Sequence, residues 1–126
     1  MLRILKIKPY EAPVLDEIEV LDSICYMKND RGSELEKMEL LESNRELKFI
    51  QLEEYIFAIC LNPKFLACDE DKNRYYDGYP VEENRQIDGV DIYGDIIVIK
   101  KIADKYYSLT IDEMDKYMYK LKGAKK

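Results

Sequence analysis

The sequence of 126 residues predicts an α+β fold, in which a mostly antiparallel sheet of about five or six strands carries two or three helices, including a C-terminal one. Three observations predict this class. Two largely apolar runs, YIFAICL at 55–61 and DIIVIKKI at 95–102, have the length and β-branched content of strands. Short turn signals between such runs favour antiparallel hairpins. Two Ser/Thr-x-x-Glu patterns are typical of helix starts. A chain of this length is expected to form one domain over 1–126.

The N-terminal part is predicted to begin with two strands, at 2–8 and 14–19, in which apolar and charged residues alternate. Pro9 and Pro13 interrupt the chain between them. A helix is expected near 20–29, and the second run also suits the start of that helix.

A second helix is predicted over 34–43, after the turn signal NDRG. Ser33 and Glu36 have the spacing of a capping box, in which a hydroxyl and a carboxylate bond to the unpaired N–H groups of a helix start. Leu35 and Met38 would then lie along one side of this helix.

Four further strands are predicted, at 47–52, 55–61, 95–102 and 106–109. The run at 55–61 is apolar at every position, which is typical of a central strand covered on both faces. The tripeptide Ala103-Asp104-Lys105 predicts a hairpin between the last two strands.

The C-terminal helix is predicted over 110–122, where Thr110 and Glu113 form the second capping box. Lysines near its end favour the helix dipole. Its apolar stripe is expected to consist of Ile111, Met114, Met118 and Leu121.

The stretch 68–95 contains nine carboxylates, three basic residues and four tyrosines. Residues 69–95 carry a net charge of −6, which equals that of the whole chain. The stretch has little periodicity and contains Gly78, Pro80 and Gly89, so we expect a long ordered loop with short strands.

A calcium loop is one reading of this stretch, because Asp69, Asp71, Asn73 and Asp77 occupy positions 1, 3, 5 and 9 of an EF-hand. Arg74 and Pro80 stand where that loop requires glycine and a bidentate glutamate, which argues against it. The alternative is an Asp- and Asn-rich turn whose side chains bond to nearby backbone N–H groups.

No catalytic set is expected. Cys25, Cys60 and Cys68 lack a histidine to activate them, since the chain contains none. Carboxylates such as Asp88, Asp91 and Asp95, or Glu82 and Glu83, would suit Mg²⁺, but a solvated acidic loop is the favoured reading. No phosphate-binding loop is present in the sequence. We therefore expect no catalytic residue, no metal and no cofactor.

The overall composition limits the function classes. A pI near 4.8 argues against a protein that grips nucleic acid phosphates directly. The longest apolar run is far shorter than the roughly 20 residues of a membrane helix, and no signal-like segment precedes it. Three cysteines without CxxC spacing favour reduced thiols. We therefore expect a cytoplasmic protein with no membrane contact.

The segments LRILKIKP, PVLDEI, YIFAICL, ENRQIDGVDIYGDIIVIK and YYSLTIDEMDKY resemble, in this order, a small uncharacterised family of phage, plasmid and conjugative-element proteins known as a domain of unknown function. The most specific parts are Asn84-Arg85, the step Gly94-Asp95-Ile96-Ile97 and Ser108-Leu109-Thr110. The similarity excludes residues 30–50. It implies an accessory gene of a mobile element in a bacterial host, and it carries over no catalytic residue.

The sequence therefore suggests a non-enzymatic accessory protein that binds and inhibits a basic, nucleic-acid-handling host defence protein, as anti-CRISPR and anti-restriction inhibitors do. Carboxylates interleaved with tyrosines would mimic the negative charge of nucleic acid. The expected partner-binding residues are Asp69, Asp71, Tyr75, Tyr76, Asp77, Tyr79, Glu82, Glu83, Asp88 and Asp91. The alternative is a small-ligand or nucleotide binder, possibly a weak metal-dependent enzyme, with this stretch as its pocket rim.

Overall fold

A computed structural model of the chain describes residues 1–21, 24–28, 35–40, 47–61, 67–71, 73–76 and 79–123. Within these residues the chain forms thirteen strands and one helix, and all the strand pairings are antiparallel. The predicted α+β class with a mostly antiparallel sheet is therefore confirmed, whereas the helices predicted near 20–29 and over 34–43 are not found in the described residues.

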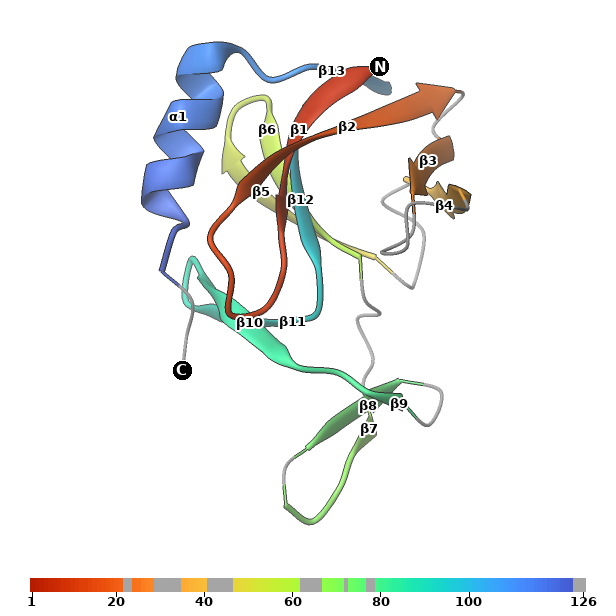
Figure 1. Cartoon of the computed structure of the whole chain (residues 1–126), viewed down its shortest axis with the longest axis vertical. Coiled ribbons are helices and arrows are strands. Elements are labelled where there is room, and N and C mark those ends of the chain that lie inside the picture. The colour runs from red at the N-terminus through yellow and green to blue at the C-terminus, as the bar shows by residue number, and fades with distance from the viewer. Residues whose placement is uncertain are drawn as a thin grey trace.

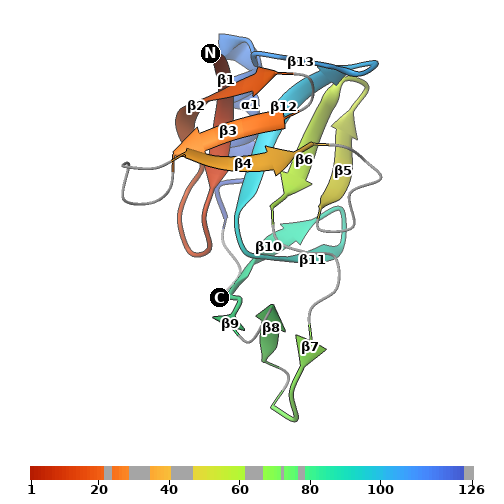
Figure 2. The same cartoon turned by 90° about the vertical axis from the view of Figure 1, so that its right-hand side faces the viewer.

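The main sheet contains eight strands in the order β4-β3-β2-β1-β12-β6-β5, and β13 also pairs with β12 (Figures 1 and 2). Its strands are β1 (Leu2–Ile7), β2 (Val14–Leu21), β3 (Ile24–Lys28), β4 (Leu35–Glu39), β5 (Lys48–Glu53), β6 (Ile56–Cys60), β12 (Ile96–Ile102) and β13 (Lys105–Tyr107). The six predicted strands correspond to six of these, with ends that differ by up to two residues. The hairpin predicted around residues 103–105 is the β12–β13 pair.

Strand β12 lies at the centre of the sheet because its first four residues are apolar on both faces. Ile96 and Val98 belong to one core cluster, whereas Ile97 and Ile99 belong to a second cluster on the opposite face. Strand β6 pairs along β12 and is almost entirely buried, which confirms the central strand predicted at 55–61.

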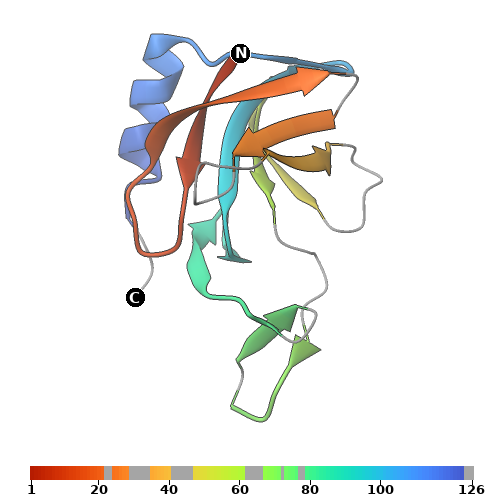
Figure 3. The same ribbon diagram turned by 45° about the vertical axis from the view of Figure 1, so that its right-hand side comes forward.

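The two faces of the sheet are covered by different parts of the chain. The helix α1 (Ile111–Lys120) contributes Met114 and Tyr117 to the first cluster. Cys25 from β3 and Leu40 after β4 join the second cluster, so the end of the sheet folds back over its own face. Figure 3 shows α1 and the β3–β4 hairpin on opposite sides of the central strands.

Two predicted helices are wrong in the part of the chain that the structure describes. Residues expected in a helix near 20–29 form strand β3, and residues expected in a helix over 34–43 form strand β4. The two strands pair with each other, and β3 also pairs with β2. Each run is too short for its apolar spacing to distinguish helix from strand, so sheet pairing decides the outcome. Ser33 of the first predicted capping box and residues 41–43 lie outside the described residues.

The C-terminal helix is confirmed together with its capping box. The backbone N–H of Glu113 donates to Thr110 Oγ1 at 3.2 Å, and the backbone N–H of Thr110 donates to Glu113 Oε1 at 2.8 Å. The predicted apolar stripe is partly wrong, because Ile111 is 65% exposed and Tyr117, with 3% exposure, takes the buried position.

Two small sheets complete the fold. Strands β10 (Glu83–Ile87) and β11 (Val90–Tyr93) form a hairpin that packs Ile87 and Ile92 into the first core cluster. Strands β7 (Ala67–Cys68), β8 (Arg74–Tyr76) and β9 (Tyr79–Pro80) form a three-stranded sheet that projects from the main sheet in all three views (Figures 1, 2 and 3). The expectation of short strands within 68–95 is confirmed.

Candidate functional site

The acidic stretch forms two separate hairpins. The turn between β7 and β8 lies at the end of the projecting sheet, whereas the turn between β10 and β11 lies beside the end of α1 (Figure 1). The described residues among the ten predicted to bind a partner are therefore divided between these two hairpins and the segment that joins them.

Asp69 closes the turn between β7 and β8. Its Oδ1 accepts from the backbone N–H groups of Asp71 and Asn73 at 3.0 and 2.9 Å, and its Oδ2 accepts from the Tyr75 hydroxyl at 3.1 Å and from Asn73 Nδ2 at 3.3 Å. The hydrogen bond from the Asn73 backbone is the main cause that lowers the pKa of Asp69 below its ordinary value. This is the Asp- and Asn-rich turn that the sequence analysis favoured over an EF-hand.

Asp88 has a similar structural role in the second hairpin. Asp88 and Gly89 both have positive φ angles, 50° and 77°, between the paired residues Ile87 and Val90. Two residues with positive φ form a type I′ turn, whose twist matches that of the flanking strands. The Asp-Gly dipeptide between two apolar residues was a hairpin signal that the sequence analysis missed.

The remaining predicted partner residues differ in exposure. Asp71, Glu82 and Asp91 are exposed, and Asp91 Oδ1 accepts from Gln86 Nε2 at 2.9 Å. Glu83 and Tyr75 are half-buried. Tyr76 and Tyr79 lie in β8 and β9, but their side chains, like all of Asp77, fall outside the described part of the structure.

A cavity of about 480 Å³ separates the projecting sheet from the body of the protein. We call it the tyrosine cavity. Its walls include Tyr10 from the β1–β2 connection, Arg74 and Tyr75 from β8, Tyr93 from β11, and the adjacent Glu82 and Glu83. All of these except Tyr10 come from the acidic stretch, so this stretch does form a pocket rim.

Arg74 lies against the Tyr93 ring, with its guanidinium carbon 5.5 Å from the ring centroid. A hydrogen bond with Tyr93 is the main cause that raises the pKa of Arg74, so its side chain stays charged. Arg74 Nε is buried and makes no hydrogen bond within the described residues. A buried donor without an acceptor is costly, which marks this atom as a candidate ligand contact.

The adjacent pair Asn84 and Arg85 in β10 is fully buried. Asn84 Nδ2 donates to the carbonyl oxygens of Ile7 at 3.0 Å and Gly94 at 2.7 Å, which ties β10 to the end of β1. Asn84 Oδ1 accepts from Arg85 Nε at 2.6 Å. The pair therefore links the β10–β11 hairpin to the main sheet.

The Arg85 guanidinium, 2% exposed, ties three segments together. It donates to the carbonyl oxygen of Leu121 at the end of α1, and to those of Lys8 and Glu11 in the β1–β2 connection. Burial lowers the pKa of Arg85 from its ordinary value. Because the last carbonyls of a helix carry partial negative charge, they stabilise the buried guanidinium. The Asn84-Arg85 pair therefore acts as a structural clamp.

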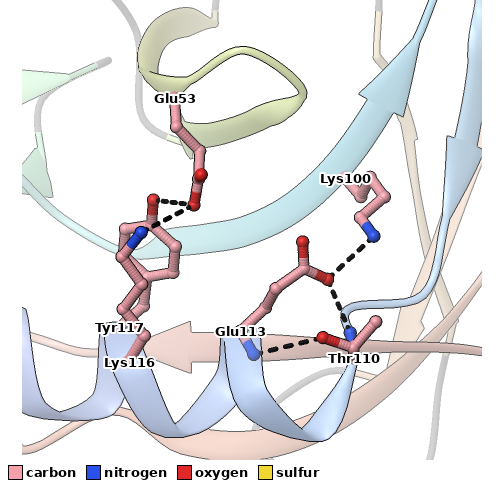
Figure 4. A network of polar contacts seen from close by, with 6 residues as sticks. All are labelled: Glu53, Lys100, Thr110, Glu113, Lys116 and Tyr117. Carbon is pink, nitrogen blue, oxygen red and sulfur yellow. Dashed lines mark hydrogen bonds and ion pairs between the residues drawn. The ribbon is translucent and has the colours of Figure 1, made fainter.

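A second polar network fixes α1 to the sheet (Figure 4). Glu53 Oε1 accepts from the Tyr117 hydroxyl at 2.5 Å and from Lys116 Nζ at 3.3 Å, while Lys100 Nζ pairs with Glu113 Oε1 at 2.8 Å. The Tyr117 hydrogen bond is the main cause that lowers the pKa of Glu53, and burial, followed by Glu53, raises the pKa of Tyr117. These contacts dock the helix.

The three cysteine thiols lie in different environments in the structure. Burial raises the pKa of Cys25 and of Cys60 to about 12, so both remain protonated, and Cys68 is exposed. No group of three or more Cys, Asp or Glu side chains among the described residues is placed to hold a metal ion. No helix in the described residues has both the length and the apolar character needed to cross a membrane.

In comparisons with family models, with curated proteins and with solved structures, no significant match to this chain was found. The resemblance to the mobile-element family stays a prediction.

Proposed function

We propose that the protein is a non-enzymatic accessory protein of a phage or mobile element, which binds and inhibits a basic, nucleic-acid-handling host defence protein. One observation carries the proposal. Six carboxylates of the acidic stretch are exposed, whereas its two described basic residues are withdrawn from the surface: Arg85 is buried and Arg74 is half-buried against Tyr93. The exposed carboxylates are Asp69, Glu70, Asp71, Glu82, Asp88 and Asp91.

The position of the carboxylates supports contact with a cationic surface. The projecting sheet holds three of them, Asp69, Glu70 and Asp71, in consecutive positions in the turn at its end (Figure 1). Unbalanced negative charge raises the encounter rate with a basic partner, and clefts that bind nucleic acid are lined by basic residues. Asp69 serves mainly to shape this turn, so Glu70 and Asp71 are the better candidates for direct contact.

The test begins with affinity capture from infected or transconjugant bacterial cells and identification of the partner by mass spectrometry. Surface plasmon resonance then compares wild type with Glu70→Lys/Asp71→Lys. We expect the double variant to associate about tenfold more slowly. The wild-type association rate should also fall steeply with salt, because the Debye length decreases from about 10 Å at 0.1 M to about 3 Å at 1 M.

Glu17→Lys/Glu19→Lys is the matched control, because both residues are exposed on β2 and the change in net charge is the same. This variant should retain most of the association rate. An equal loss for the two double variants would mean that only overall charge matters. Unchanged association for Glu70→Lys/Asp71→Lys would exclude the projecting sheet as the partner surface.

A further inference from the structure

We propose that the tyrosine cavity is a binding site for a guanine base, presented as a nucleoside. This inference goes beyond the proposed function and rests on the residues that line the cavity, of which Arg74 and Glu82 also belong to the acidic stretch considered above. The volume of the tyrosine cavity lies within the range of roughly 300–1,000 Å³ that is typical of small-molecule sites. It combines aromatic walls, one guanidinium and two carboxylates, which together favour a flat ligand with both acceptors and donors.

The aromatic walls come from three separate segments. Tyr10 lies in the β1–β2 connection, Tyr75 in β8 and Tyr93 in β11, so the cavity exists only in the folded chain. Planar heteroaromatic rings stack on tyrosine, and this interaction tolerates any base. Stacking alone therefore explains affinity for a base but not a choice among bases.

Arg74 is the first residue that would discriminate among bases. Its buried Nε lacks a hydrogen-bond acceptor among the described residues, so a ligand acceptor at this position would remove the cost of an unsatisfied donor. Arginine pairs with the adjacent O6 and N7 acceptors of guanine, whereas adenine presents an amino donor in place of O6.

Glu82 and Glu83 would discriminate among bases at the opposite edge of the ligand. Both line the cavity and offer carboxylate oxygens to the N1–H and amino donors on the opposite edge of guanine. Two carboxylates beside a single guanidinium repel a phosphate group. The ligand is therefore recognised through its base, and a 5′-phosphate does not improve binding.

The backbone conformation of Tyr10 indicates that the part of the cavity wall formed by this residue is held in place. Tyr10 has a φ angle of 64°, a left-handed conformation that is strained for a residue with a side chain. Arg85 bonds to the carbonyl oxygens of Lys8 and Glu11 on either side of it. The buried clamp therefore positions the tyrosine at the rim of the cavity.

The test uses two-dimensional ¹H–¹⁵N NMR titration of the full chain with guanosine, adenosine, uridine and guanosine 5′-monophosphate. We expect guanosine to shift the amide signals of Arg74, Tyr75 and Tyr93, with adenosine and uridine binding at least about tenfold more weakly because the Arg74 and carboxylate contacts are lost. Guanosine 5′-monophosphate should bind no more tightly than guanosine.

Arg74→Lys keeps the positive charge but removes the Nε donor, and it should weaken guanosine binding by about tenfold. Arg3→Lys is the matched control, since Arg3 is exposed on β1, and should leave the dissociation constant unchanged. Glu82→Gln replaces an exposed carboxylate that lines the cavity by an amide and should also weaken guanosine binding, so recognition of the base can be tested even if Arg74→Lys fails to fold.

Three outcomes would overturn the proposal: no shift at the cavity residues up to millimolar guanosine, equal binding of all three nucleosides, or tighter binding of the monophosphate. Because Glu70 and Asp71 do not line the cavity, Glu70→Lys/Asp71→Lys should leave guanosine binding unchanged. If guanosine does not bind, the partner-binding proposal is unaffected. If Glu70→Lys/Asp71→Lys does not slow partner association, the guanosine proposal is unaffected.

Discussion

Replacing Arg85 by methionine should destabilise the protein severely, although Arg85 is not one of the residues proposed to contact a ligand or a partner. The guanidinium donates to three backbone carbonyls and to Asn84 Oδ1. A hydrogen bond that involves a charged group contributes about 1.5–3 kcal/mol, but such terms are not additive. The carbonyls of Glu11 and Leu121 lie close to the surface and can be rehydrated. We therefore expect a loss of about 3–5 kcal/mol in the free energy of unfolding.

The assay is urea denaturation followed by circular dichroism, with thermal unfolding as a second measurement. A loss of this size is a large fraction of the roughly 5–15 kcal/mol that stabilises a typical domain, and it should lower Tm by more than about 10 °C. Arg3→Met is the control, because Arg3 is exposed and its loss should change stability by less than about 0.5 kcal/mol. Hydrogen exchange should also accelerate at the end of α1 in Arg85→Met.

The opposite result is physically possible, because a buried charge carries a desolvation penalty that a well-packed apolar side chain avoids. If Arg85→Met were as stable as wild type, the clamp would not stabilise the fold. If its stability fell but hydrogen exchange at the end of α1 did not change, the bond to the Leu121 carbonyl would not be the important one.

Two further predictions concern α1 and the β10–β11 turn. Because the Tyr117 hydrogen bond lowers the pKa of Glu53 below its ordinary 4.5, this contact should stabilise the fold at neutral pH and be lost as the pH falls through the lowered value. Denaturation of Glu53→Gln and wild type at several pH values should therefore give a difference that disappears in acid, and a constant difference would exclude the linkage. Gly89→Ala should cost about 1–2 kcal/mol from its φ of 77° alone, since an added Cβ meets nothing within 4 Å. Gly123→Ala, also in open space but without that backbone constraint, should change the free energy of unfolding little. Equal effects of the two substitutions in urea denaturation would show that the positive φ of Gly89 is not the cause of the loss.

Elements with strong local signals could be predicted from the amino-acid sequence alone. The apolar runs that became β6 and β12 are long enough to exclude a loop, and Thr110 with Glu113 marks the start of α1 whatever packs around it. In these cases the residues that specify the element are neighbours in the chain. The acidic composition of 68–95 and its short strands were also readable, as was the Asx-type turn around Asp69.

The other features could not be predicted, because they depend on contacts between residues that lie far apart in the sequence. The runs that became β3 and β4 carry a helix-like spacing, yet the pairing of β3 with β2 and of β4 with β3 satisfies their backbone groups in a sheet. In the sequence Arg85 resembles any other charged residue, but in the folded chain it is buried and its guanidinium donates to the carbonyl oxygens of Leu121 and Lys8. The same folding divides the acidic stretch between two hairpins and brings Tyr10 beside Arg74 to form a cavity. Composition predicts how much charge a segment carries, whereas long-range packing determines which of those charges meet solvent and which line a site.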